Sequence, residues 1–271
     1  MRNLLVHLDS SAPTKNRLEL AVALATRMGS RLVGIFAQTQ RSVTSGVVAA
    51  WPPAEYVAAR KAAEEAFTAA AAGLADCVFM DINRGEEADI LAQAVDLARH
   101  FDLVVCGQPS SDTQTMPGDL IERIVVDSGR PVLVVPHAGH FPDTGRKPMF
   151  TWNDSREAAR AFVDGIRITV KEAEAVVVSV SKPGDPEIGY RKASLQFAVA
   201  HLKAHGIKGR ADQALASDIG LMDALLNEAA DFGADLLVLG AFGGQGYPRF
   251  SRGSGSRFML KHMTLPVLLS H

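Results

Sequence analysis

The stretch Asp102-Leu-Val-Val-Cys-Gly107 decides the fold, because it occurs a second time as Asp235-Leu-Leu-Val-Leu-Gly240. Another pair of stretches follows it in the same order: Pro131-Val-Leu-Val-Val-Pro136 is matched by Pro266-Val-Leu-Leu-Ser-His271. The members of the first pair lie 133 residues apart and those of the second pair 135 apart, so spacing is nearly preserved over half of the chain. This repetition predicts a duplicated domain.

Short apolar runs alternate with longer amphipathic stretches in both halves, which is typical of βαβ units and a parallel sheet. The runs are rich in Val, Ile and Leu without alternation, as expected of strands covered on both faces. In the first half we expect strands at Asn3–Leu8, Arg31–Ala37, Cys77–Asn83, Leu103–Gly107 and Pro131–Pro136, and helices at Lys15–Met28, Ala54–Ala72, Glu86–His100 and Asp119–Asp127. In the second half we expect strands at Met149–Trp152, Ala175–Val180, Gly209–Ala214, Leu236–Gly240 and Pro266–Leu269, and helices at Ser155–Val170, Glu187–His205, Asp218–Phe232 and Ser254–His262.

Each half therefore reads β-α-β-α-β-α-β-α-β, and right-handed crossovers would fold it into a doubly wound open sheet with helices on both faces. The chain of 271 residues is long enough for two domains of about 135 residues. The polar segment His137–Pro148, with its glycines and prolines, is the best linker. We predict an α/β protein of two tandem domains, residues 1–138 and 148–271, joined by the linker 139–147.

The composition is that of a globular protein, with 47% hydrophobic residues, 21% charged residues and a net charge of −2. This balance predicts no nucleic-acid or anionic membrane partner. No apolar run approaches the ~20 residues of a membrane span, and Met1–Asp9 reads as a first strand rather than a signal peptide. Cys77 and Cys106 both lie in apolar stretches, which predicts buried free thiols, no disulfide and a cytoplasmic location.

The loop that follows the strand ending at Gly240 is the strongest candidate for a ligand site. Gly240 lets the chain turn off the strand, while Gly243 and Gly253 permit positive φ and close approach of a phosphate to backbone N–H groups. Ser254 stands where a helix begins, so its hydroxyl can cap that helix or bind an anion there. Three arginines add positive charge around the loop: Arg249, Arg252 and Arg257. A glycine-rich turn alone is more often structural, but the duplication and the strand-to-helix context favour a ligand.

Neither G-x-x-x-x-G-K-[ST] nor G-x-G-x-x-G is present in this loop, which reads G-x-x-G, nine residues, then G-S. That pattern resembles the nucleotide signature of the universal stress proteins, in their tandem two-domain form. The stretches Phe150–Arg160 and Pro266–His271 are similar to the family's first strand exit and last strand. The resemblance is strong in the second half; in the first half it rests on Leu8–Ser11, the strand pattern and Arg130-Pro131-Val132.

The resemblance implies five parallel strands in the order 3-2-1-4-5 and ATP, or another adenine nucleotide with or without Mg²⁺, lying across strands one and four. Carried over to this chain, it implies a phosphate loop and an adenine and ribose site. The phosphate residues are Gly240, Gly243, Gly253, Ser254 and Ser256, and the adenine and ribose residues are Thr151, Trp152, Asn153 and Val180. The family usually has aspartate where Asn153 stands, a departure that favours weaker binding or none.

The first half keeps the acidic position as Asp9, but Gly107-Gln-Pro-Ser110 breaks the glycine spacing, and Pro109 removes a backbone donor. We predict no nucleotide in this half. Ser10 and Ser11, which follow Asp9, are interpreted as helix-capping residues rather than nucleophiles.

The remaining polar clusters favour structural roles. His201 and His205 share a helix face and could bind a metal, but no third ligand accompanies them, and His137 with His140 is an equally weak pair. Trp152 is either a core residue or a platform on which a base stacks. No Ser-His-Asp, Cys-His or paired-carboxylate spacing predicts a catalytic site.

The leading hypothesis is therefore a cytosolic, non-catalytic adenine-nucleotide-binding stress-response protein. Its two domains would pack as a pseudo-dimer within one chain, and the nucleotide in the second domain would act as a switch. A nucleotide-free scaffold for protein contacts and a slow ATP hydrolase are the alternatives. A homodimer or another protein partner stays open.

Overall fold

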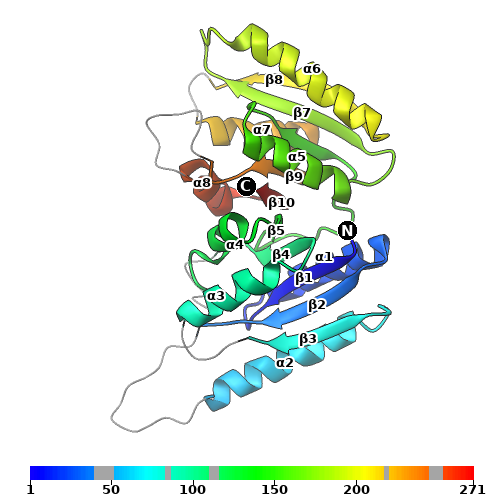
Figure 1. Ribbon diagram of the computed structural model, residues 1–271, viewed down its shortest axis with the longest axis vertical. Coiled ribbons are helices and arrows are strands. Elements are labelled where there is room, and N and C mark those ends of the chain that lie inside the picture. The colour runs from blue at the N-terminus through cyan, green and yellow to red at the C-terminus, as the bar shows by residue number, and fades with distance from the viewer. Residues whose placement is uncertain (40–51, 83–86, 110–115, 217–219, 244–252) are drawn as a thin grey trace. The chain divides into compact units, whose positions relative to one another are not determined.

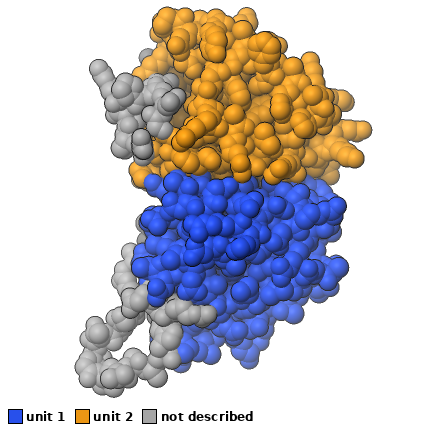
Figure 2. Space-filling model, viewed as in Figure 1, with its two compact units in different colours: residues 1–140 blue, residues 141–271 orange. Residues whose placement is uncertain are grey.

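The computed structural model describes residues 1–39, 52–82, 87–109, 116–216, 220–243 and 253–271. The chain divides into two compact units, Met1–His140 and Phe141–His271, which Figure 2 colours separately. The boundary falls inside the segment 139–147.

Unit 1 is a parallel sheet of five strands in the order β3-β2-β1-β4-β5 (Figure 1). The strands are β1 (Asn3–Leu8), β2 (Arg31–Phe36), β3 (Cys77–Asp81), β4 (Leu103–Gly107) and β5 (Val132–Val135). The helices are α1 (Thr14–Met28), α2 (Ala54–Ala70), α3 (Glu87–Ala98) and α4 (Leu120–Ser128). Because the chain winds outward from β1 in both directions, α1 packs with α2 on one face and α3 with α4 on the other.

Unit 2 repeats this topology with the strand order β10-β9-β6-β7-β8. Its strands are β6 (Pro148–Thr151), β7 (Glu174–Ser181), β8 (Lys208–Leu215), β9 (Leu236–Gly240) and β10 (Val267–Ser270). Its helices are α5 (Arg156–Ile168), α6 (Ile188–Ala204), α7 (Leu221–Phe232) and α8 (Ser254–His262). The prediction of two doubly wound α/β domains, each with the order 3-2-1-4-5, is confirmed.

The duplicated aspartates at the start of the repeated stretch have the same role in both units. In unit 1, the Asp102 carboxylate accepts hydrogen bonds from the amides of Arg2 (2.6 Å) and Asn3 (3.1 Å). In unit 2, the Asp235 carboxylate accepts three, at 2.9, 2.8 and 2.9 Å, from the amides of Gly145, Arg146 and Lys147. Burial acts to raise the pKa of Asp102, but these amides outweigh it and the pKa is lowered. Each aspartate thus holds the entrance of the fourth strand against the entrance of the first.

The central strands form the core, whereas the edge strand of unit 1 departs from the expected burial. Every residue of β4 is buried, including Cys106, and burial raises the pKa of its thiol to about 12. In β3, however, Cys77 is exposed, and Val78 and Met80 are 36% and 39% exposed. The predictions that Cys77 is buried and that this strand is covered on both faces are therefore wrong. β3 has β2 as its one neighbour, and an apolar run does not reveal that a strand lies at an edge.

Candidate functional site

The candidate nucleotide site of unit 2 lies where the strand order reverses. β6 pairs with β7 on one side and with β9 on the other, so the connections that leave β6 and β9 diverge there. Ligands of open α/β sheets bind beyond the carboxyl ends of such strands. The topology therefore brings the exit of β6, with Asn153, to the same edge of the sheet as the loop after Gly240.

Ser254 is the first residue of α8, and its side chain is partly exposed. The residue before it, Gly253, has a φ of 80°, in the left-handed region that glycine adopts most easily. No side chain caps the helix, and the Ser254 hydroxyl makes no hydrogen bond to the described residues. A helix of this length carries about half a positive charge at its first turn. The hydroxyl and the helix end together offer donors to an anion.

Ser256 has an internal role instead. It is 7% exposed, and its Oγ accepts a hydrogen bond of 2.9 Å from the amide of Phe242. Phe242 has a φ of 55°, which costs a residue other than glycine about 1–2 kcal/mol. A Cβ placed on Gly253 would come 2.8 Å from the Phe242 ring. Ser256 thus holds a strained turn against the start of α8. Sequence reasoning missed Phe242, because nothing in G-x-x-G marks its third residue.

The two glycines at the exit of β9 pack against the start of α5. A Cβ on Gly240 would overlap the backbone nitrogen of Ala158, and a Cβ on Gly243 would come 2.8 Å from Cδ and 3.0 Å from Oε2 of Glu157. The backbone of α5 therefore requires glycine at position 240, whereas at position 243 the Glu157 side chain could move aside. The space beside Gly243 is occupied by the Glu157 carboxylate.

Glu157 lies at the candidate site, and the sequence analysis did not assign it a role there. It is 5% exposed and forms an ion pair of 2.7 Å with Arg156. Burial acts to raise its pKa, but the hydrogen bond and charge of Arg156 outweigh burial, and the pKa is lowered. The side chain therefore carries a negative charge at neutral pH beside the expected phosphate loop.

The residues expected to hold adenine and ribose make local contacts at the exit of β6. The Thr151 hydroxyl donates to the carbonyl of Val238 (3.0 Å), which joins β6 to β9. Asn153 is exposed, and its Oδ1 accepts from the Ser155 amide (3.3 Å) and hydroxyl (2.7 Å). Ser155 in turn caps α5 by accepting from the Ala158 amide. Asn153 therefore stabilises the strand-to-helix turn, and its Oδ1 is hydrogen-bonded to Ser155.

Trp152 ties β6 to the neighbouring helices. Its Nε1 donates to Ser194 of α6 (2.8 Å) and to Asp154 (3.0 Å). Its ring lies edge-on to Phe162 at a centroid distance of 5.5 Å.

Val180, the remaining residue expected near the base, is half-buried near the end of β7. Arg249 and Arg252 lie outside the described residues.

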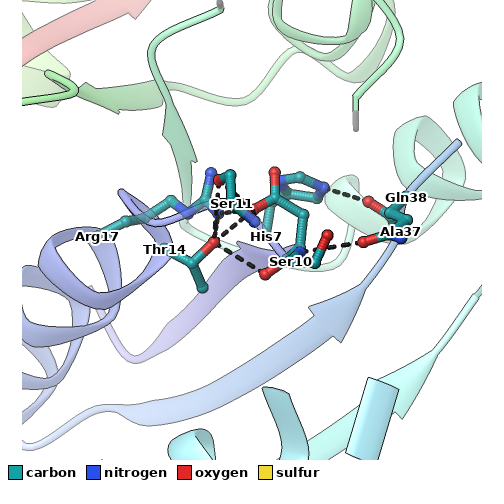
Figure 3. A network of polar contacts seen from close by, with 8 residues as sticks. His7, Ser10, Ser11, Thr14, Arg17, Ala37 and Gln38 are labelled. Atoms are coloured by element: carbon teal, nitrogen blue, oxygen red, sulfur yellow. Dashed lines mark hydrogen bonds and ion pairs between the residues drawn. The ribbon is translucent and has the colours of Figure 1, made fainter. Parts of the chain in front are cut away.

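The corresponding region of unit 1 contains a buried polar network, drawn in Figure 3. Asp9 Oδ1 accepts from the Ser11 amide (3.1 Å) and hydroxyl (2.5 Å), from Arg17 Nη2 (3.0 Å) and from Thr14 Oγ1. Burial acts to raise the pKa of Asp9, but the Arg17 guanidinium and these donors hold it well below its usual range. The helix-capping interpretation is wrong, since Pro13 precedes α1 and no side chain caps it. The Asp9 carboxylate instead accepts hydrogen bonds from Arg17, Ser11 and Thr14.

His7 lies beneath this network. It is 1% exposed, and its Nε2 donates to the Ala37 carbonyl (2.6 Å), while Nδ1 has no partner among the described residues. Burial, assisted by the charge of Arg17, lowers the pKa of His7 to about 4. The ring is therefore neutral at physiological pH.

The histidine pairs make contacts with other side chains. The rings of His201 and His205 stack at 4.9 Å, and His201 also meets Phe162 edge-on. His140 Nδ1 lies 3.3 Å from a carboxylate oxygen of Glu19. Within the part of the chain that the structure describes, no three His, Cys, Asp or Glu side chains are grouped as metal ligands.

The family model described as "Universal stress protein family" matches residues 1–136, just over half of the chain. The chain belongs to the universal stress protein family. The match covers the half without the glycine signature, whereas the resemblance was strongest in the second half.

Two solved structures have the same fold over nearly the whole chain. A universal stress protein from Archaeoglobus fulgidus DSM 4304 is 17% identical, with a TM-score of 0.67 over 99% of this chain and 95% of that one. A functionally unknown protein from Pseudomonas aeruginosa PAO1 is 16% identical, with a TM-score of 0.60 over 100% of this chain and 92% of that one. No curated protein sequence matches significantly. Among the described helices, none has the length and apolar character needed to cross a membrane.

Proposed function

We propose that this universal stress protein binds an adenine nucleotide, ATP or a close analogue with or without Mg²⁺, at the carboxyl ends of β6 and β9 in unit 2. Bound nucleotide would act as a non-catalytic switch in a stress response. Family membership supports the proposal, and one observation carries it. The Ser254 hydroxyl lies at the first turn of α8 and makes no hydrogen bond to the described residues, and the preceding Gly253 has a left-handed conformation.

Two opposing electrostatic contributions meet at the candidate site of unit 2. The amides and dipole at the start of α8 attract a polyphosphate, as helix N-termini do in many nucleotide sites. The Glu157 carboxylate repels it, although Arg156 at 2.7 Å offsets part of that charge. Arg257, on the first turns of α8, adds a cation on the attractive side. We expect attraction to prevail and ATP to bind with a dissociation constant of about 1 μM to 100 μM.

Titration calorimetry of ATP into the full chain tests the site. Ser254→Ala should weaken binding by about tenfold, because it removes a hydroxyl that donates to a charged group. Ser10→Ala is the control, since this exposed serine follows β1 of unit 1, outside the candidate site, and its loss should leave the affinity unchanged. Equal affinities for wild type and Ser254→Ala would place the nucleotide elsewhere.

A nucleotide-free scaffold for protein contacts is the second candidate, and Glu157 favours it. A buried, ionised carboxylate against Gly243 opposes a phosphate, and the Asn153 oxygen is already engaged by Ser155. The variant Glu157→Gln separates the candidates, with Glu174→Gln at the opposite end of the sheet as control. If wild type binds no ATP and Glu157→Gln does, the carboxylate excludes the nucleotide and the scaffold is supported.

A slow ATP hydrolase is tested by measuring phosphate release from ATP. Release above background that Ser254→Ala abolishes would indicate a hydrolase.

A further inference from the structure

Helix α6 of unit 2 exposes an apolar face. It packs on β7 and β8 (Figure 1) through four buried side chains: Leu195, Ala198, Val199 and Leu202. The opposite side of the helix carries the residues that we call the α6 stripe, all of them exposed: Tyr190, Ala193, Phe197, Ala200 and Ala204. Phe197 is 78% exposed and Tyr190 is 69% exposed, more than any other large apolar side chain among the described residues.

The α6 stripe has the spacing of a surface that packs against another helix. Its residues follow one another at alternating intervals of three and four, the spacing of the a and d positions in paired helices. Their sizes alternate as well, since an alanine follows each aromatic residue along the stripe. A ring beside an alanine forms a ridge next to a gap, so the rings of a second such stripe can fill the gaps.

The related helix of unit 1, α2, has a different surface. Its exposed side carries ion pairs one turn apart, between Arg60 and Glu64 and between Lys61 and Glu65. Val57, which is 47% exposed, is its one exposed large apolar residue. The fold that the two units share therefore does not require an apolar stripe at this position, and α6 departs from its counterpart.

The charges at the two ends of α6 favour a second copy of this chain as the occupant. At the start, Arg191 pairs with Asp185 (3.4 Å) and Glu187 (2.9 Å), so two carboxylates and one guanidinium leave one net negative charge. The other end carries four exposed basic side chains: His201, Lys203, His205 and Lys208. An antiparallel second copy would place the acidic start of each helix beside the basic end of the other.

We propose that α6 forms a homodimer interface, in which the stripes of two chains pack antiparallel about a two-fold axis near Leu195. Tyr190 then meets Ala200 of the second copy and Ala193 meets Phe197 of the second copy, because both pairs are centred on residue 195. One pair of helices makes a small interface, so we expect a dissociation constant of about 1–100 μM. The stripe contains no residue of the candidate nucleotide site, and the proposal does not depend on the proposed function.

Sedimentation velocity of the full chain over about 1–300 μM should show a reversible equilibrium between monomer and dimer. Phe197→Gln should weaken dimerisation at least about tenfold, because glutamine keeps the helix propensity but removes the apolar ring. Val57→Gln is the matched control, since it makes the same kind of change at an exposed apolar residue of α2 and should leave the equilibrium unchanged.

Chemical cross-linking tests the antiparallel arrangement. Gln196 is exposed and flanks the stripe beside the proposed axis, so the two copies of Gln196→Cys should be linked readily by a short bis-maleimide. Lys192→Cys, on the same helix but farther from the axis, should be linked much more slowly. Both variants are made with Cys77→Ser, because Cys77 is exposed.

Three outcomes would overturn the proposal. A wild-type chain that stays monomeric over the whole concentration range has no such interface. A dimer that Phe197→Gln and Val57→Gln affect equally would use another surface. Equal cross-linking rates for the two cysteine variants would contradict the antiparallel pair. Circular dichroism checks that Phe197→Gln is folded, and the wild-type sedimentation measurement needs no variant.

Discussion

At the scale of single residues, each unit buries a charged side chain near the carboxyl ends of its first and fourth strands. In unit 1 it is Arg17, which closes over Gly107 and pairs with Asp9. In unit 2 it is Glu157, which lies against Gly243 and pairs with Arg156. Unit 1 therefore buries a complete ion pair at this place, since Asp9 is buried with Arg17, whereas the Arg156 partner of Glu157 in unit 2 is exposed.

His7 should make the stability of the protein depend on pH. Its pKa of about 4 in the folded state lies below the ordinary 6.5, so the unfolded state binds more protons between these values. The stabilisation is complete above pH 6.5 and is lost as the pH falls toward 4. Urea unfolding should show a loss of roughly 2 kcal/mol between pH 7.5 and pH 5.

His7→Gln is the matched variant for this measurement, since its amide can still donate to the Ala37 carbonyl but does not titrate. The free energy of unfolding of this variant should change less over the same range. An identical pH dependence in both proteins would assign the effect to other groups.

At the scale of elements, the exit of β9 depends on how closely α5 approaches it. Gly240 meets the backbone of Glu157 and Ala158, which cannot move aside as a flexible side chain can. Gly240→Ala should therefore lower the free energy of unfolding by about 1–3 kcal/mol, the usual cost of overpacking.

Gly189→Ala supplies the control for Gly240→Ala. Gly189 lies in α6 with no atom within 4 Å of an added Cβ, so alanine should raise stability by up to about 1 kcal/mol through its helix propensity. Urea unfolding measures both variants. Equal effects would show that α5 does not press on this glycine.

At the scale of the whole molecule, the duplication gives each unit an aspartate clamp, an aspartate at the start of the fourth strand that accepts hydrogen bonds from amides at the start of the first strand. Asp102→Ala removes the acceptor for two amides in unit 1, and Asp235→Ala removes the acceptor for three in unit 2. Each loss should cost about 1 kcal/mol, because these amides lose their carboxylate acceptor while water can reach most of them.

Hydrogen exchange resolved by peptide can locate these two effects. Asp102→Ala should reduce protection mainly within residues 1–140, and Asp235→Ala mainly within residues 141–271. A uniform loss across both units from either variant would contradict separate clamps.

The sequence alone determined the elements and their order. β1, β4, β9 and α8 begin and end at the residues predicted, because uninterrupted apolar runs and helical periodicity are local patterns. The repetition of DLVVCG as DLLVLG also predicted two domains of one fold. Only the tertiary structure decided the exposure of Cys77, the partner of Asp9, the approach of Glu157 to Gly243 and the cover of Arg17 over Gly107. Asp9 and Arg17 are only eight residues apart and meet where β1 leads into α1, but the other three features depend on segments distant in sequence that meet at a strand end or a sheet edge. No pattern along the chain specifies which side chains make these contacts.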